Sequence, residues 1–71
     1  MKFSPARFKV LLARRQATYL DFARETGIPA VTISQALRGV RNPTLRTIGR
    51  LAAGLGVDVT EIIEQEEHNE K

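Results

Sequence analysis

Four polar side chains in the middle of the chain are of the types that bind nucleic acids: Gln35, Arg38, Arg41 and Asn42. Guanidinium groups neutralise and hydrogen-bond phosphates, and a side-chain amide can both donate to and accept from the edge of a base. Their spacing places two of them on a predicted helix and two in the loop that follows it. The chemistry that this group favours is the binding of a polyanion. Arg46, which follows, stays unassigned.

Catalytic and metal-binding chemistry has no comparable basis in the sequence. The carboxylates near the C-terminus are accompanied by no nucleophile and no glycine-rich loop. His68 has no second ligand at a metal-binding spacing, and the absence of cysteine excludes disulfides and thiolate zinc sites. We therefore expect a protein that is not an enzyme and that binds no metal and no cofactor.

The charges are distributed unevenly along the chain. Residues 1–50 hold ten Lys and Arg against Asp21 and Glu25, a net charge of +8. Residues 51–71 hold Lys71 against six carboxylates, a net charge of −5. A basic body followed by an acidic end suits a nucleic-acid partner better than an acidic protein, although a solvated basic surface would give the same total.

The length of 71 residues predicts one small domain. We expect the folded domain to span residues 1–64, with residues 65–71 as an acidic, disordered tail. No apolar run approaches the roughly 20 residues that a membrane-spanning helix needs, and no signal peptide is visible, so we expect a cytoplasmic protein.

The polar side chains must be positioned by residues 18–38, which read as two short helices joined by a tight turn. Thr18 is a favoured N-cap for the first of these helices. Ala23 is small enough for a close helix crossing, and Gly27 tolerates the positive φ of a sharp turn. Ile33 then packs the second helix onto the first. This spacing is typical of a helix-turn-helix, whose second helix enters the major groove of DNA.

The flanking residues predict three more helices and no strand. Ser4 and Pro5 are typical of a helix start, and that helix should end near Gln16, with Phe3 stapling its entry. Thr44 should cap a helix that buries an apolar face. That face comprises Leu45, Ile48, Leu51, Ala52 and Leu55. Asp58 and Glu61 form the D-x-x-E pattern of a capping box for a short fifth helix through Ile62 and Ile63.

Residues 7–63 resemble the Cro/C1-type (Xre-like) helix-turn-helix family of phage and bacterial repressors. The motifs that carry the resemblance are Phe22-Ala23, Gly27-Ile28, Thr32-Ile33-Ser34, the run from Gly39 to Thr44, Leu51-Ala52 and Leu55-Gly56-Val57. The resemblance implies an all-α, five-helix, lambda-repressor-like domain that binds double-stranded operator DNA as a homodimer. The residues that it places against bases are Ala30, Val31, Thr32 and Gln35. Those that it places against phosphates are Thr18, Tyr19, Arg38, Arg41 and Asn42.

The sequence departs from the family pattern in three ways. Tyr19 stands where relatives carry a phosphate-binding Gln, and it offers one donor in place of two. Ala30 and Val31 are apolar, which suits thymine methyl groups or indicates weak base reading. Leu12 and Leu37 replace an Arg–Glu pair, so we expect an apolar contact between the first and third helices.

Three functions stay open on the sequence. We expect a transcriptional regulator, most simply a repressor, with Ile62 and Ile63 at the dimer interface because one of two adjacent isoleucines must point outward. Leu20 also has no evident place in the core. The run from Ala23 to Thr47 is similar to a branch of antitoxins, which favours a toxin as an alternative partner. The plain Ala30 and Val31 leave room for an interaction module that has lost DNA binding.

Overall fold

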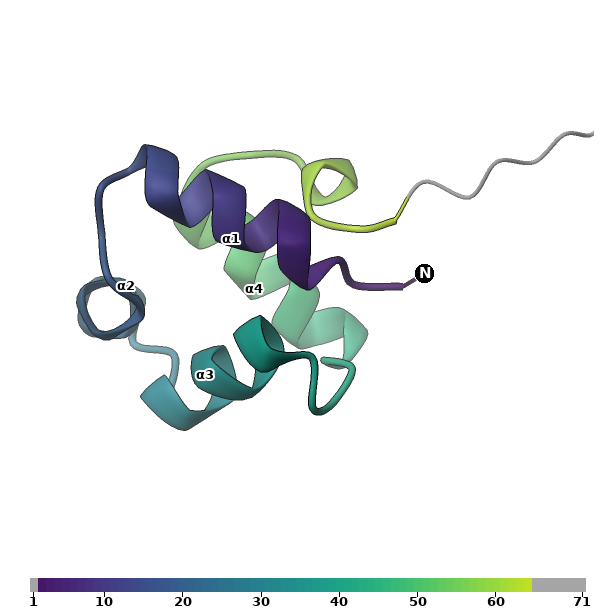
Figure 1. The fold of residues 1–71 in the computed structure, drawn as a ribbon, viewed down its shortest axis with the longest axis horizontal. Helices are drawn as coiled ribbons and strands as arrows, with labels where there is room; N and C mark the ends of the chain where they lie inside the picture. The colour runs from purple at the N-terminus through teal and green to yellow at the C-terminus, as the bar shows by residue number, and fades with distance from the viewer. Residues whose placement is uncertain (1, 65–71) are drawn as a thin grey trace, which may run out of the picture.

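The structure, a computed structural model, describes residues 2–64, and the tail 65–71 with His68 lies outside that range. Within it the chain forms helices α1 (Pro5–Arg14), α2 (Tyr19–Thr26), α3 (Ala30–Arg38) and α4 (Leu45–Leu55), then a 3-10 turn η1 (Val59–Glu61) (Figure 1). No strand occurs among these residues, apart from a single antiparallel bridge between Phe3 and Ile63. The all-α prediction is confirmed, whereas the count of five helices is not, because the 3-10 turn η1 stands where the short fifth helix was predicted.

The segment after α4 fails to form an α-helix because its backbone bonds elsewhere. Asp58 caps η1 by accepting from the Thr60 hydroxyl at 2.6 Å and from the Thr60 N–H at 3.0 Å, and these bonds lower the pKa of the Asp58 carboxyl. The following residues pair with the start of the chain: Ser4 N–H donates to the Ile62 carbonyl and Glu64 N–H to the Lys2 carbonyl, each at 2.8 Å. Because the backbone groups of residues 62–64 pair with residues 2–4, they do not continue into a further helical turn.

Helix α1 begins as the sequence predicts. The Ser4 side chain accepts from Arg7 N–H at 3.2 Å, and Pro5 occupies the first helical position. Phe3 and Phe8 lie on either side of this cap with ring centroids 5.6 Å apart, which is the geometry of a hydrophobic staple. The helix ends at Arg14, two residues before the predicted end near Gln16.

The turn between α2 and α3 depends on more than its glycine. Gly27 adopts φ 78° and donates to the Ala23 carbonyl at 2.9 Å, as a left-handed cap requires. Thr26 fixes the turn from both sides, because its hydroxyl donates to the Phe22 carbonyl at 2.8 Å and accepts from Ile28 N–H at 3.2 Å. Ile28 is thereby directed into the core, where it is 3% exposed.

Arg15 ties three helices together at the end of α1. Its guanidinium donates to the Gly54 carbonyl of α4 at 3.1 Å and to Glu25 of α2 at 3.0 Å, and it lies 5.9 Å from the centroid of the Phe22 ring. Opposite this tie, Gly54 lies so close to α2 that an added Cβ would be 2.7 Å from the Thr26 methyl carbon.

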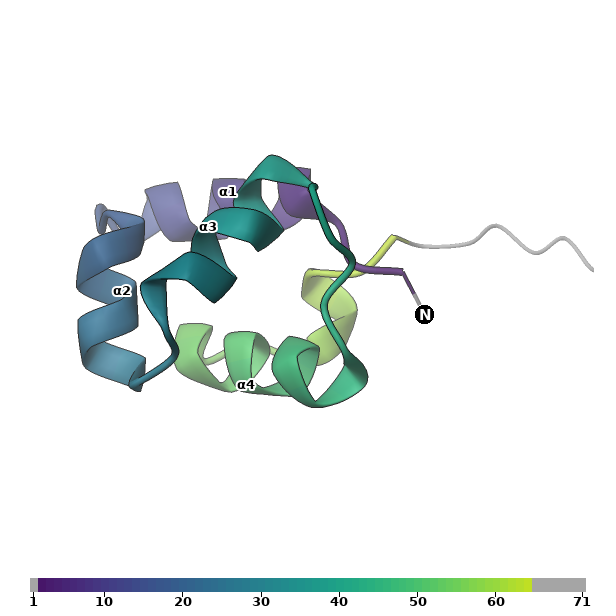
Figure 2. The same ribbon diagram turned by 90° about the horizontal axis from the view of Figure 1, so that it is seen from below.

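The core lies between the four helices and is bordered by the two paired segments, residues 2–4 and 62–64 (Figures 1 and 2). Its largest fully buried side chains are Phe8, Phe22, Ile33, Ile48, Leu51 and Ile62. Leu12 is also buried, and Leu37 packs against the core from α3. A direct contact between these two side chains stays a prediction. Leu45 contradicts its predicted inward position, since it is 67% exposed at the first turn of α4. Leu20 lies outside the core, as expected.

Candidate nucleic-acid interface

Helix α3 lies nearest the viewer when the molecule is seen from below, between α2 and the loop that leads to α4 (Figure 2). Its inner side is fixed by Ile33 and Ala36, which are 0% and 1% exposed. Val31 is 61% exposed on its first turn, and Arg38 is exposed at its last residue. The other predicted base-contacting residues are half-buried, namely Ala30, Thr32 and Gln35.

The end of α3 turns the chain back over that helix. Gly39 N–H donates to the Ala36 carbonyl and Val40 N–H to the Gln35 carbonyl, both at 3.2 Å, which is the pattern of a Schellman motif. The motif needs a left-handed residue at its turning point, and Gly39 has φ 69°. Arg41 and Asn42 therefore return beside the second turn of α3.

This return creates a hollow of about 180 Å³ between α3, the loop and the start of α4, and most of the residues that line it are polar. Four predicted contact residues line it: Thr32, Gln35, Arg41 and Asn42. The structure thus brings base-reading and phosphate-holding candidates to one surface. Ala30, Val31 and Arg38 lie on α3 outside this hollow.

Thr44 and Thr47 also line the hollow, and the sequence reasoning did not assign them a role there. Thr44 is the N-cap of α4: its Oγ1 accepts from Thr47 N–H at 3.2 Å and donates to the Thr47 hydroxyl at 3.0 Å. The N-terminus of α4, which carries the partial positive charge of its helix dipole, is therefore beside Arg41. The capping pattern was visible in the sequence, but its position near Gln35 required the fold.

The hollow is electrostatically suited to an anion. No acidic residue lines it, and Arg38 and Arg41 form no ion pair with any residue of 2–64. The three ion pairs of that range lie elsewhere, joining Lys2 to Glu64, Arg15 to Glu25 and Arg24 to Asp21. Cations without a protein partner remain available to phosphates.

Thr18 and Tyr19 lie at the start of α2. Thr18 forms a capping box with Asp21, accepting from its N–H at 3.1 Å and donating its own N–H to the carboxylate at 3.3 Å. Tyr19 is 37% exposed at the first residue of α2. Neither residue lines the hollow by α3, so they would form a separate contact.

The two residues predicted at the dimer interface differ in their surroundings. Ile62 is 0% exposed within its own chain, which leaves it no surface to offer a partner, so its assignment to an interface is corrected. Its burial follows from the bond between the Ile62 carbonyl and Ser4, which holds this residue against the core. Ile63 is half-buried, and its place at an interface stays a prediction.

Together, the α2–turn–α3 unit and the anion-suited surface beside α3 define a helix-turn-helix DNA-binding protein. A family model described as helix-turn-helix (HTH_3) matches residues 12–62, and the chain belongs to this Cro/C1-type family of DNA-binding transcription regulators. No curated protein and no solved structure matches the chain. In residues 2–64 no helix has the length and apolar character needed to cross a membrane.

Proposed function

We propose that this transcription regulator is a repressor that binds a two-fold operator as a homodimer and blocks polymerase sterically. The observation that carries the proposal is the shared hollow of Thr32, Gln35, Arg41 and Asn42, where a base edge and a phosphate can be contacted together. One recognition helix reads only a few base pairs. Two helices about 34 Å apart on one face of the duplex would supply the missing specificity.

Within this proposal, the side chains divide into those that read and those that hold. Ala30, Val31, Thr32 and Gln35 face the bases, with Val31 offering its exposed methyl groups to thymine. Arg38, Arg41 and Asn42 hold one phosphate segment beside the N-terminus of α4. Thr18 and Tyr19 hold another at the start of α2.

Gln35→Ala and Arg41→Ala are expected to weaken DNA binding in two different ways. Loss of the Gln35 amide should cost about 1–3 kcal/mol on the preferred site and blunt discrimination at one base pair per half-site. Loss of Arg41 should weaken preferred and random DNA alike and reduce the slope of log K against log salt by about 0.9. The measurement is a set of titrations on both DNAs at several salt concentrations, after selection of the preferred site from random DNA.

Arg14→Ala is the matched control for Arg41→Ala. It removes one exposed guanidinium from α1, which does not line the hollow beside α3, and it should leave the slope of log K against log salt unchanged. Equal loss on both DNAs for Gln35→Ala would mean that this residue reads no sequence. If neither Gln35→Ala nor Arg41→Ala alters binding, the DNA-binding face has been misplaced and an interaction module becomes the better hypothesis.

Ile63→Asp is expected to weaken self-association and, with it, binding to a two-fold site. Ile63 is half-buried where it pairs with Phe3, so a carboxylate there would be desolvated against a second copy. Sedimentation with and without DNA measures the change, and circular dichroism checks that the helices persist. Val10→Glu, which places a charge on the exposed side of α1, should leave association intact. A wild type that stays monomeric under all conditions, also on DNA, would refute the dimer.

An antitoxin is the second candidate function, since it would use the same DNA-binding face and add a toxin as protein partner. The observation that favours a protein partner is an apolar hollow between α1 and η1, lined in part by Val10 and Leu11. Stable co-purification with a toxin would distinguish this function from that of a simple repressor.

A further inference from the structure

The hollow between α1 and η1 exposes apolar surface that the proposed DNA contacts do not use. It has a volume of about 270 Å³ and is lined by Ala6, Arg7, Val10, Leu11, Arg14 and Glu61. Val10 is 52% exposed and Leu11 is half-buried at its base. An apolar centre with a polar rim is the usual arrangement of a contact between proteins. The volume falls below the roughly 300–1,000 Å³ of small-molecule pockets and suits one or two inserted side chains.

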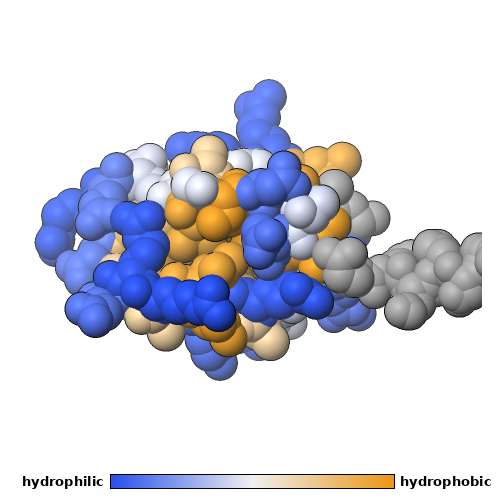
Figure 3. Space-filling model, turned by 90° about the horizontal axis from the view of Figure 1, so that it is seen from above, coloured by the Kyte–Doolittle hydropathy of each residue, from blue (hydrophilic) through white to orange (hydrophobic). Residues whose placement is uncertain are grey.

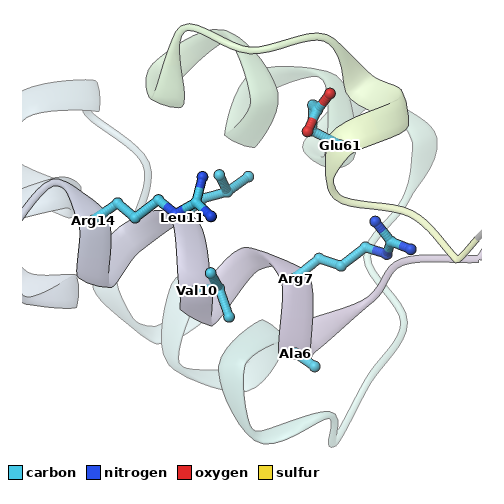
Figure 4. Close-up of a pocket in the computed structure, with 6 residues that line it drawn as sticks. All are labelled: Ala6, Arg7, Val10, Leu11, Arg14 and Glu61. Atoms are coloured by element: carbon cyan, nitrogen blue, oxygen red, sulfur yellow. The ribbon is translucent and has the colours of Figure 1, made fainter.

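The rim of this hollow is mainly positive. Arg14 and Arg7 lie toward its two ends along α1, with Leu11 between them and Glu61 across from them on η1 (Figure 4). The two arginines are seven residues apart on one helix, which separates their Cα atoms by about 10 Å along the axis. Neither forms an ion pair with any residue of 2–64. A partner therefore meets two cations that are unpaired within residues 2–64 and whose Cα atoms the helix holds at a fixed spacing.

The hollow also lies away from the recognition helix. The view from below has α3 in front (Figure 2), whereas the view from above has apolar atoms in the middle of the face, with hydrophilic residues around them (Figure 3). A second copy docked here by a two-fold axis would direct its own α3 away from the first, so the two could not share one face of a duplex. This step rests on the proposal that α3 binds DNA. The sequence 65–71 of this chain supplies acidic but no apolar side chains.

We propose that this surface binds an amphipathic segment of another protein, in which an apolar side chain lies between two acidic residues about two helical turns apart. A helix laid along α1 would insert its apolar side chain over Val10 and Leu11 and pair its carboxylates with Arg7 and Arg14. The apolar contact supplies affinity, and the two guanidinium groups fix the register and exclude basic partners. DNA on α3 and this segment can be bound at the same time.

The test is selection of helix-forming peptides from a random displayed library on the wild-type protein, with counter-selection on Val10→Glu. Val10 is exposed, so this change adds a carboxylate to the hollow without altering the core. Enriched peptides are expected to carry acid, apolar residue and acid over about two turns. Synthetic copies should bind wild type at least about tenfold more tightly than Val10→Glu or the double variant Arg7→Glu/Arg14→Glu. Peptides in which lysine replaces the acidic residues should bind that double variant more tightly than they bind the wild type.

Lys9→Gln is the matched control, because it makes the same change of one charge unit as Val10→Glu on α1 but does not line the hollow. It should leave peptide affinity unchanged. The proposal fails if selection yields no sequence that distinguishes wild type from Val10→Glu, or if the enriched peptides lack acidic residues. Binding is measured without DNA, and again on the protein saturated with its selected site. Failure of DNA binding alone therefore identifies an error in the proposed function, and loss of peptide on DNA-bound protein would refute simultaneous binding.

Discussion

Replacement of Phe8 by alanine is expected to remove a large share of the stability of the protein. Phe8 is 0% exposed, and its ring lies 5.6 Å from that of Phe3 and 5.7 Å from that of Phe22. It therefore connects Phe3, in the segment paired with Ile63, to Phe22 of the helix-turn-helix. Truncation of such a phenylalanine costs about 3–5 kcal/mol. A domain of this size has a total stability of only about 4–10 kcal/mol.

Urea denaturation followed by far-ultraviolet circular dichroism measures this loss. Val10→Ala is the matched control, since it shortens an apolar side chain on the same helix at a position that is 52% exposed, and it should change stability by no more than about 0.5 kcal/mol. Equal midpoints for Phe8→Ala and Val10→Ala would mean that the aromatic cluster does not centre the core. The result also bears on the extent of the domain, because Phe3 and Phe8 both precede the residues 12–62 matched by the family model.

The features that were predictable from sequence are those set by neighbours along the chain. Ser4, Thr18 and Thr44 each cap the helix that follows, because a cap needs only its own side chain and the next three residues. Gly27 and Gly39 end helices for a similarly local reason, namely their tolerance of positive φ. The helix-turn-helix followed from these signals together with the apolar spacing around Ile33.

The sequence-based predictions failed where contacts with residues distant along the chain determine the structure. Leu45 fits the apolar period of α4 but lies at its first turn, where no neighbouring element covers it. Ile62 and Ile63 are adjacent and alike, and Ile62 is the buried one where this segment pairs with residues 2–4, which are distant in the sequence. Likewise, the Arg15 tie joins residues 39 positions apart along the chain, and no local pattern specifies it.

The candidate site divides in the same way. The contact residues on α3 and its loop were assigned from the resemblance, residue by residue. Their convergence with Thr44 and Thr47 on one hollow depends on the Schellman turn at Gly39, which sets the direction of the loop. The hollow between α1 and η1 was not predicted, because it exists only where Glu61 is brought opposite α1.

Gly54→Ala is expected to destabilise the protein by about 1–3 kcal/mol, although alanine favours helices. The added Cβ would lie 2.7 Å from Thr26 Cγ2 and 2.9 Å from Phe22 Cζ, closer than carbon atoms approach without a shift. Phe22 is fully buried, so α2 must move away from α4. That movement would also disturb the bond from Arg15 to the Gly54 carbonyl.

Two companion variants separate this clash from a general effect of glycine. Gly49 lies in the same helix with no atom within 4 Å of an added Cβ, so Gly49→Ala should stabilise the protein by up to about 1 kcal/mol. Thr26→Ser removes the nearest methyl group but keeps the hydroxyl that bonds Phe22 and Ile28. Added to Gly54→Ala, it should recover part of the loss, with a coupling of about 0.5–3 kcal/mol in urea denaturation. Additive effects of Thr26→Ser and Gly54→Ala would show that α2 and α4 are not in contact there. Matching gains for Gly49→Ala and Gly54→Ala would show that helix propensity, and not packing against Thr26, governs both positions.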